Sequence, residues 1–170
     1  NELCFHQDKT PIPLKTTITT LDKYPLKDVA EFVKNAWEAF GITTEVQTFS
    51  QAELERDIIK PRNYEVLLFG EILGKIPDPF PFWHSSQVKD PGLNLSGLEN
   101  KKLDSTLLKL RRESNEEKRK ELLEEAQDIL VAEYPAQVLY DTPYLYFTPL
   151  ELKGIKGNLV SDPSERFAGM

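Results

Sequence analysis

The stretch that decides the fold begins YEVLLFG (64–70) and continues through LGKIPDP (73–79), FPFWHSSQ (80–87) and GLNLSG (92–97). Its opening apolar run has the length and composition of a strand buried on both faces. Aromatic, amide and hydroxyl side chains then follow on a long loop. In α/β proteins, ligands bind where such loops leave the carboxyl ends of strands. The stretch therefore predicts an α/β protein with a ligand-binding loop after this strand.

The residues before this stretch predict two more strands, each followed by a helix. Residues 14–20 are rich in Thr and Ile, and residues 42–49 have the alternating pattern of a strand. Between them, Pro25 favours a helix start and Gly41 a helix end. The apolar face of that helix comprises Val29, Ala30, Val33, Ala36, Trp37 and Phe40. With a short helix over 52–59, the β-α-β-α-β order favours parallel strands covered by helices.

The second half of the chain predicts a pair of helices and two closing strands. Asn100 is placed to cap a helix over 100–112, and the sequence SNEE, which opens a helix over 114–133, is a capping-box pattern. Apolar residues recur at helical spacing in both helices. They are Leu103, Leu107 and Leu110 in the first, and Leu122, Leu123, Ala126, Ile129 and Leu130 in the second. Residues 136–140 and 144–148 predict strands.

Composition bounds the classes of function. The 170 residues suffice for one domain core, and a net charge of −7 without a basic stripe argues against nucleic-acid binding. No apolar run approaches the length of a membrane span, and the first residues lack the pattern of a signal peptide. Cys4 is the single cysteine, so no internal disulfide can form. His6 and His84 are far apart without clustered ligand spacing, so we expect no metal and no cofactor.

The order of these elements resembles the C-terminal lobe of bacterial extracellular solute-binding proteins of family five, the oligopeptide- and dipeptide-binding type. The resemblance is strongest from the decisive stretch onward, whereas the earlier residues match in element order alone. It is carried by that stretch, by the two predicted helices, and by YPAQVLY (134–140), PYLY (143–146), LKGI (152–155) and SDPSERF (161–167).

The resemblance implies an α/β fold class, a type II periplasmic-binding-protein-like lobe with a mostly parallel, mixed sheet flanked by helices. It implies an incoming linker over 1–13, the solute-binding lobe over 14–153, and an outgoing segment over 154–170. The chain would be an excised lobe of an extracytoplasmic, substrate-binding component of an ABC importer. Its partners would be a peptide or other small solute, the missing N-terminal lobe and the transporter permease. Ligand would bind between two lobes that close about a hinge.

Six residues of the loop are candidate ligand contacts: Glu71, Asp78, Phe82, Trp83, Asn94 and Ser96. Phe82 and Trp83 either line an apolar pocket or pin the loop to the core, and alternate side chains of an extended segment would divide between the two. Asn94 and Ser96 either bond a peptide backbone or form an Asx or Ser turn. Asp78 is either a carboxylate for a cationic ligand group or the cap of its own turn.

Two departures from the family bear on the ligand. Many members have Trp after the glycine that ends the strand, whereas Glu71 follows Gly70 here. Some peptide binders of the family hold the peptide's amino group with an acidic residue four positions after that glycine, where this chain has Gly74. Glu71 or Asp78 could substitute for that residue, and the ligand could be a different solute.

Two other classes of function remain open. A small α/β enzyme could use Asp78 and His84, but the loop has no complete catalytic set and no GxSxG elbow, so we expect no enzyme and no catalytic residues. We expect His84 to donate hydrogen bonds to loop backbone. An interaction domain that has lost solute binding is the third hypothesis, favoured by the departures at Glu71 and Gly74.

Overall fold

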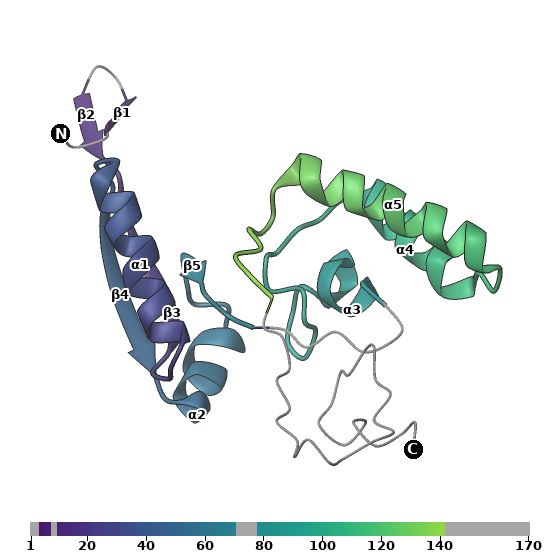
Figure 1. Cartoon of the computed structure of the whole chain (residues 1–170), viewed down its shortest axis with the longest axis horizontal. Coiled ribbons are helices and arrows are strands. Elements are labelled where there is room, and N and C mark those ends of the chain that lie inside the picture. The colour runs from purple at the N-terminus through teal and green to yellow at the C-terminus, as the bar shows by residue number, and fades with distance from the viewer. Residues whose placement is uncertain (1–3, 8–9, 71–77, 142–170) are drawn as a thin grey trace, which may run out of the picture. The chain divides into compact units, whose positions relative to one another are not determined.

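The computed structural model describes residues 4–7, 10–70 and 78–141 (Figure 1). The chain divides into two compact units, Asn1–Glu71 and Ile72–Met170. All of the described strands lie in the first unit, and the described elements of the second are helical. The predicted strand over 144–148 and the predicted outgoing segment over 154–170 lie outside the described residues. The predicted segment boundaries stay a prediction.

The first unit is built on a parallel sheet with the strand order β4–β3–β5 (Figure 1). The central strand β3 (Lys15–Leu21) pairs along its whole length with β4 (Thr43–Phe49). On its other side it pairs with the short strand β5 (Val66–Leu67). Both pairings are parallel, which confirms the predicted β-α-β-α-β arrangement.

Helix α1 (Leu26–Ala39) connects β3 to β4 and is bounded as the sequence predicts. Pro25 is its N-cap, and Gly41 follows its end with a φ of +92°, a left-handed conformation that glycine adopts without a Cβ clash. The predicted apolar face is wrong at Phe40. The helix ends at Ala39, so Phe40 becomes the C-cap and its side chain is exposed.

The predicted short helix over 52–59 is confirmed as α2 (Gln51–Glu53), which continues without a break into the π-helix η1 (Leu54–Ile59). Ser50 caps it through a capping box: its hydroxyl accepts the N–H of Glu53, and the Glu53 carboxylate accepts the N–H of Ser50. Leu54 and Ile58 are buried. The apolar spacing does not distinguish a π turn from an α turn over so short a span.

Strand β5 corrects the prediction of a continuous strand, buried on both faces, over residues 64–69. The strand itself comprises only Val66 and Leu67, both half-buried, and one further bond joins the N–H of Leu68 to the carbonyl of Thr19 at 2.9 Å. Phe69 is exposed. One reason is local, because the Glu65 carboxylate accepts the backbone N–H of Thr17 at 2.8 Å, which a longer ladder would pair with a carbonyl. The other is position, because β5 is an edge strand within the described sheet.

Residues 4–13, which the sequence predicts as part of a linker, contain an antiparallel hairpin of β1 (Cys4–Gln7) and β2 (Thr10–Pro13). Prolines are compatible with a two-stranded ribbon, because an outward-facing N–H is not needed for pairing. The hairpin is separate from the three-stranded sheet. The linker role of this segment stays a prediction.

The described part of the second unit contains four helices: α3 (Phe80–Trp83), the 3₁₀ turn η2 (Ser85–Gln87), α4 (Lys101–Arg112) and α5 (Glu116–Glu133). The two long helices confirm the predicted pair and pack together through a core of Leu103, Leu107, Ala126 and Ile129. The Asn100 side chain caps α4 by accepting two backbone N–H groups, as predicted.

Helix α5 starts one residue later than the capping-box pattern predicts. Its N-cap is Asn115, whose side chain accepts the N–H of Lys118. Just before the helix, the Glu113 carboxylate accepts the backbone N–H groups of both Ser114 and Asn115. Those bonds, led by the one from Asn115, lower the pKa of Glu113.

Two further predictions for this unit are wrong. Residues 80–83 form a short helix instead of an extended segment, since Pro79 at the N-cap and Pro81 inside the first turn suit a helix start. Residues 136–140 form no strand, and Val138 is 81% exposed. The described part of the second unit offers that segment no strand to pair with.

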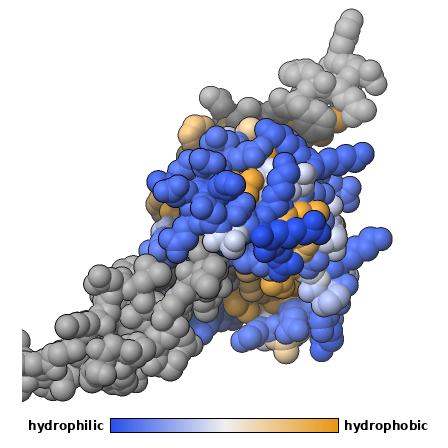
Figure 2. Space-filling model, turned by 90° about the vertical axis from the view of Figure 1, so that its right-hand side faces the viewer, coloured by the Kyte–Doolittle hydropathy of each residue, from blue (hydrophilic) through white to orange (hydrophobic). Residues whose placement is uncertain are grey.

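The side of the second unit shown in Figure 2 is mostly hydrophilic, in keeping with the mixed charges of α4 and α5. Among the described residues, no helix combines the length and apolar character needed to cross a membrane.

Candidate ligand-binding loop

The short helix α3 divides its aromatic side chains between two environments. Phe80 and Trp83, three residues apart and so on one face, pack against the core between α4 and α5. Phe82 is half-buried and does not belong to that cluster. Trp83 therefore pins the loop to the core, one of its two expected roles, while its role as a ligand contact stays a prediction.

Asp78 is held by two groups of its own unit. Its carboxylate accepts the backbone N–H of Phe80 at 3.2 Å, which caps the turn as one interpretation of the sequence expected. It also forms a bidentate ion pair with Arg111, at 2.9 Å to Nε and 2.7 Å to Nη2. The Arg111 guanidinium lies 4.0 Å from the centre of the Phe80 ring. The charge of Asp78 is thus compensated within the unit.

His84 and Ser85 are held against α4 by Asp104. The Asp104 carboxylate accepts the N–H of Ser85 at 2.8 Å and its hydroxyl at 2.6 Å. His84 stacks on Phe80, with ring centres 4.2 Å apart, and its buried Nε2 has no hydrogen-bond partner. That nitrogen lies 3.9 Å from Asp104 Oδ1.

The hydrogen bond that His84 makes to the loop backbone runs opposite to the prediction. Its Nδ1 accepts the N–H of Ser86 at 3.1 Å and so caps η2. The Ser86 hydroxyl lies 2.9 Å from the same nitrogen. Both the backbone N–H and the hydroxyl of Ser86 therefore meet the same ring nitrogen of a residue two positions earlier, which is the geometry of a local turn.

Asn94 and Ser96 form the centre of a tightly bonded loop. Asn94 is fully buried, and its amide donates to the carbonyls of His84 (3.3 Å) and Leu98 (3.0 Å). The Ser96 hydroxyl donates to Asn94 Oδ1 at 3.0 Å and accepts the N–H of Leu98 at 3.3 Å. These contacts fit the Asx and Ser turn reading. A ligand role for the pair stays a prediction.

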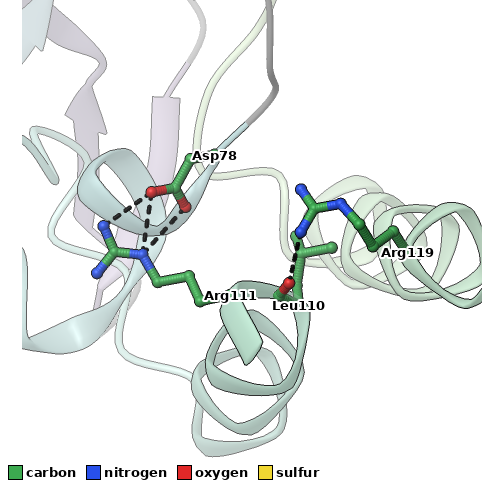
Figure 3. A pocket seen from close by; sticks show the side chains of 4 residues that line it. All are labelled: Asp78, Leu110, Arg111 and Arg119. Carbon is green, nitrogen blue, oxygen red and sulfur yellow. Dashed lines mark hydrogen bonds and ion pairs between the residues drawn. The ribbon is translucent and has the colours of Figure 1, made fainter. Parts of the chain in front are cut away.

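A pocket of about 310 Å³ opens beside the ion pair (Figure 3). It is lined by Asp78, Leu110, Arg111 and Arg119. Arg119 donates from Nη1 to the carbonyls of Leu110 (2.8 Å) and Glu113 (3.3 Å), so a cation satisfies the C-terminal end of α4. Figure 3 shows Asp78 and Arg111 facing one another on one side and Arg119 on the other.

Three charged residues of this region were absent from the sequence-based site: Asp104, Arg111 and Arg119. The spacing of Asp104 and Arg111, seven apart on one helix face, was a usable signal, but their partners lie 19 and 33 residues away. Glu71, the remaining candidate, lies outside the described residues. Within the described ranges, no group of His, Cys, Asp or Glu side chains is placed to hold a metal ion.

Comparison with known proteins identifies a relative for most of the chain. It is 27% identical over 128 residues to the oligopeptide-binding protein OppA of Bacillus subtilis (strain 168), a match that spans 75% of this chain and 23% of that protein. No protein-family model matches the chain.

Solved structures with the same fold include two peptide complexes. AppA from Bacillus subtilis, bound to a nonapeptide, has a TM-score of 0.67 at 22% identity and aligns with 76% of this chain and 26% of its own. The periplasmic binding protein DppA of Helicobacter pylori, associated with an ABC transporter and bound to the peptide STSA, has a TM-score of 0.61 at 25% identity. That alignment covers 72% of this chain and 24% of DppA.

The fold is therefore α/β and of the type II periplasmic-binding-protein-like class, with a parallel sheet flanked by helices. Within that class, the chain resembles oligopeptide- and dipeptide-binding proteins of the family-five solute-binding type, over part of their length. The chain spans about a quarter of the length of the proteins it matches.

Proposed function

We propose that this chain forms one lobe of the substrate-binding component of an ABC importer and captures a peptide or related solute in a cleft completed by a second lobe. The observation that carries the proposal is the match to OppA over 128 residues, which spans most of this chain and under a quarter of that protein. The fold likeness to peptide complexes supports it.

The mechanism we propose is binding without catalysis. Backbone hydrogen bonds would supply affinity for a peptide, and roomy pockets would accept different side chains. Lobe closure would then present the loaded protein to a permease outside the cytoplasm. The Ser86–His84 turn contact supports a non-enzymatic reading, because it gives the histidine a capping role.

The described contacts rank the candidate ligand residues. Phe82 lies outside the core cluster, and we propose that it supplies apolar contact to the ligand. Asp78, Asn94 and Ser96 each would have to exchange an existing bond for a ligand bond, so we place them behind Phe82. Glu71 is the proposed carboxylate for a cationic ligand group, because Asp78 is already paired with Arg111.

Calorimetry with synthetic tri-, tetra-, penta- and nonapeptides tests the proposal. The complete gene product is expected to bind at least one of them with a dissociation constant near 1 μM, about −8 kcal/mol. The 170-residue chain alone is expected to give little or no heat. Micromolar binding by the isolated chain would contradict the divided site, and no binding by the complete gene product would contradict peptide capture.

A further inference from the structure

Two residues of helix α4, Asp104 and Arg111, bind the segment that contains α3. These residues are seven apart, two helical turns, and so lie on the same face. We infer that they form a clamp, named here the α4 clamp, which positions α3 and thereby sets the place of Phe82. The ligand part of this inference rests on the proposed function, whereas the geometric part does not.

The first point of the clamp fixes the end of the segment. Asp104 is largely buried, and its two oxygens accept the N–H and the hydroxyl of Ser85, at 2.8 and 2.6 Å. One carboxylate that binds both groups of the same residue defines the position and the direction of the chain there. Bonds to an ionised acceptor are also stronger than those between neutral groups.

The second point fixes the beginning of the segment. Arg111 binds Asp78 through two nitrogens, and its guanidinium lies over the Phe80 ring. The planar fork of arginine matches a carboxylate at two positions, which adds directional specificity that a lysine would lack. Arg111 therefore contacts both Asp78, two residues before α3, and Phe80, the first residue of α3.

Ring contacts join the two points. Phe80, beneath Arg111, stacks on His84, and His84 Nε2 approaches Asp104. Between the points lies a helix of four residues, which is too short to be stable by its own hydrogen bonds. Its position must come from tertiary contacts, and the described ones are the α4 clamp and the packing of Phe80 and Trp83 on the core.

The clamp matters for binding because a protein side chain that contacts a ligand must be held within about half an ångström of its productive position. Phe82 lies between Phe80, which contacts Arg111 and the core, and Trp83, which packs on the core, so we expect its backbone to have little freedom. Loss of either clamp residue is expected to loosen α3 without removing any side chain that we assign to ligand contact. Asp104 and Arg111 are thus positioning residues.

The test uses Trp83 as a reporter in the complete gene product, with Trp37 and any other tryptophan replaced by phenylalanine. Asp104→Asn and Arg111→Gln are compared with Asp128→Asn and Arg112→Gln, matched exposed residues whose side chains form no hydrogen bond or ion pair within the described part of the chain. Trp83 emission, amide exchange at Ser85 and calorimetric affinity for the same synthetic peptides are measured. Circular dichroism reports whether each variant is folded.

Both clamp variants are expected to shift Trp83 emission to longer wavelength and weaken peptide binding about tenfold, and Asp104→Asn to speed Ser85 exchange about tenfold. The controls should leave all three unchanged. Asp104→Glu, which restores a carboxylate, should recover part of the emission shift. If Asp104→Asn does not fold, Ser85→Ala removes one bond alone and should give a smaller shift in the same direction.

Unchanged emission and exchange in folded clamp variants would overturn the inference, whatever the ligand result. A protein that binds no peptide but shows both changes would overturn the proposed function and leave the clamp standing. Changed emission with unchanged affinity would overturn the ligand part of the inference.

Discussion

The two units of this chain achieve order in different ways. In the first, backbone pairing between β3 and β4 runs the full length of both strands and fixes the positions of their side chains. In the second, the loop between α3 and α4 has no ladder, and single side chains such as Asp104 and Asn94 hold it. The first unit should therefore tolerate most single substitutions, whereas the loop of the second should respond sharply to a few.

The largest expected effect is in the core that supports the loop. Leu107 is fully buried between α4 and α5, so Leu107→Ala should cost about 3–4 kcal/mol of unfolding free energy through lost burial and a cavity. The neighbouring Leu108 is 40% exposed, and Leu108→Ala should cost about 1 kcal/mol or less. Urea denaturation of both variants measures the difference, and equal losses would contradict the assigned core.

Trp83 and Phe82 sharpen the comparison within the loop itself. Trp83 packs on the core, so Trp83→Ala should lower the free energy of unfolding by about 3 kcal/mol. Phe82→Ala should lower the free energy of unfolding by about 1 kcal/mol, and it should weaken peptide binding more than Trp83→Ala does. Melting and calorimetry on both variants of the complete gene product separate the roles. A large affinity loss in folded Trp83→Ala with little effect of Phe82→Ala would reverse them.

These effects also mark how far the sequence predicts the molecule. The long helices and the parallel β-α-β-α-β order were predictable, because apolar spacing and caps such as Asn100 and Gly41 are local signals. The length of β5 was not, since it depends on Glu65 and on the edge of the sheet. The apolar composition of a segment indicates that it is buried, but not how many of its residues pair with a neighbouring strand.

The residues that make up the loop were identified from the sequence, but the structure of the loop was not. Its aromatic and polar residues were identified as a site, yet Asn94 turned out to be fully buried. The contacts that decide this join residues far apart in sequence, such as Arg111 with Asp78. No periodicity encodes such a pair, so the sequence left Asp78 with two interpretations and Trp83 with two more.

The next largest effect on stability is expected from a comparison of two glycine substitutions, one in each unit. A Cβ at Gly92 would lie 2.2 Å from the carbonyl oxygen of Gln87, so Gly92→Ala should cost about 1–3 kcal/mol by forcing backbone apart. A Cβ at Gly70 would meet nothing within 4 Å, and Gly70→Ala should be nearly neutral. Thermal melts of both variants decide. A neutral Gly92→Ala would mean that the loop is looser than its hydrogen bonds indicate.

The smallest expected effect compares one glutamate in each unit under acid. Hydrogen bonds from Ser50 lower the pKa of Glu53, and hydrogen bonds led by that of Asn115 lower the pKa of Glu113. A carboxyl whose pKa is lower in the folded state binds its proton more readily when unfolded. Its contribution is therefore complete above the ordinary value of 4.5 and is lost as the pH falls through the lower, folded value.

Glu53→Gln and Glu113→Gln should accordingly be slightly less stable than the parent at pH 7, and the difference should disappear as the pH falls from 4.5 through the lower, folded value. Glu121→Gln, at an exposed position on α5 without a hydrogen-bond partner in the described part of the chain, removes the same charge and serves as the control. The Glu53 side chain is exposed and that of Glu113 is partly exposed, so solvent screening keeps the effect small. Melts from pH 2.5 to 7 measure it. Convergence for one variant but not the other would show that side-chain capping matters in one unit alone, which would sharpen the contrast between ladder and loop.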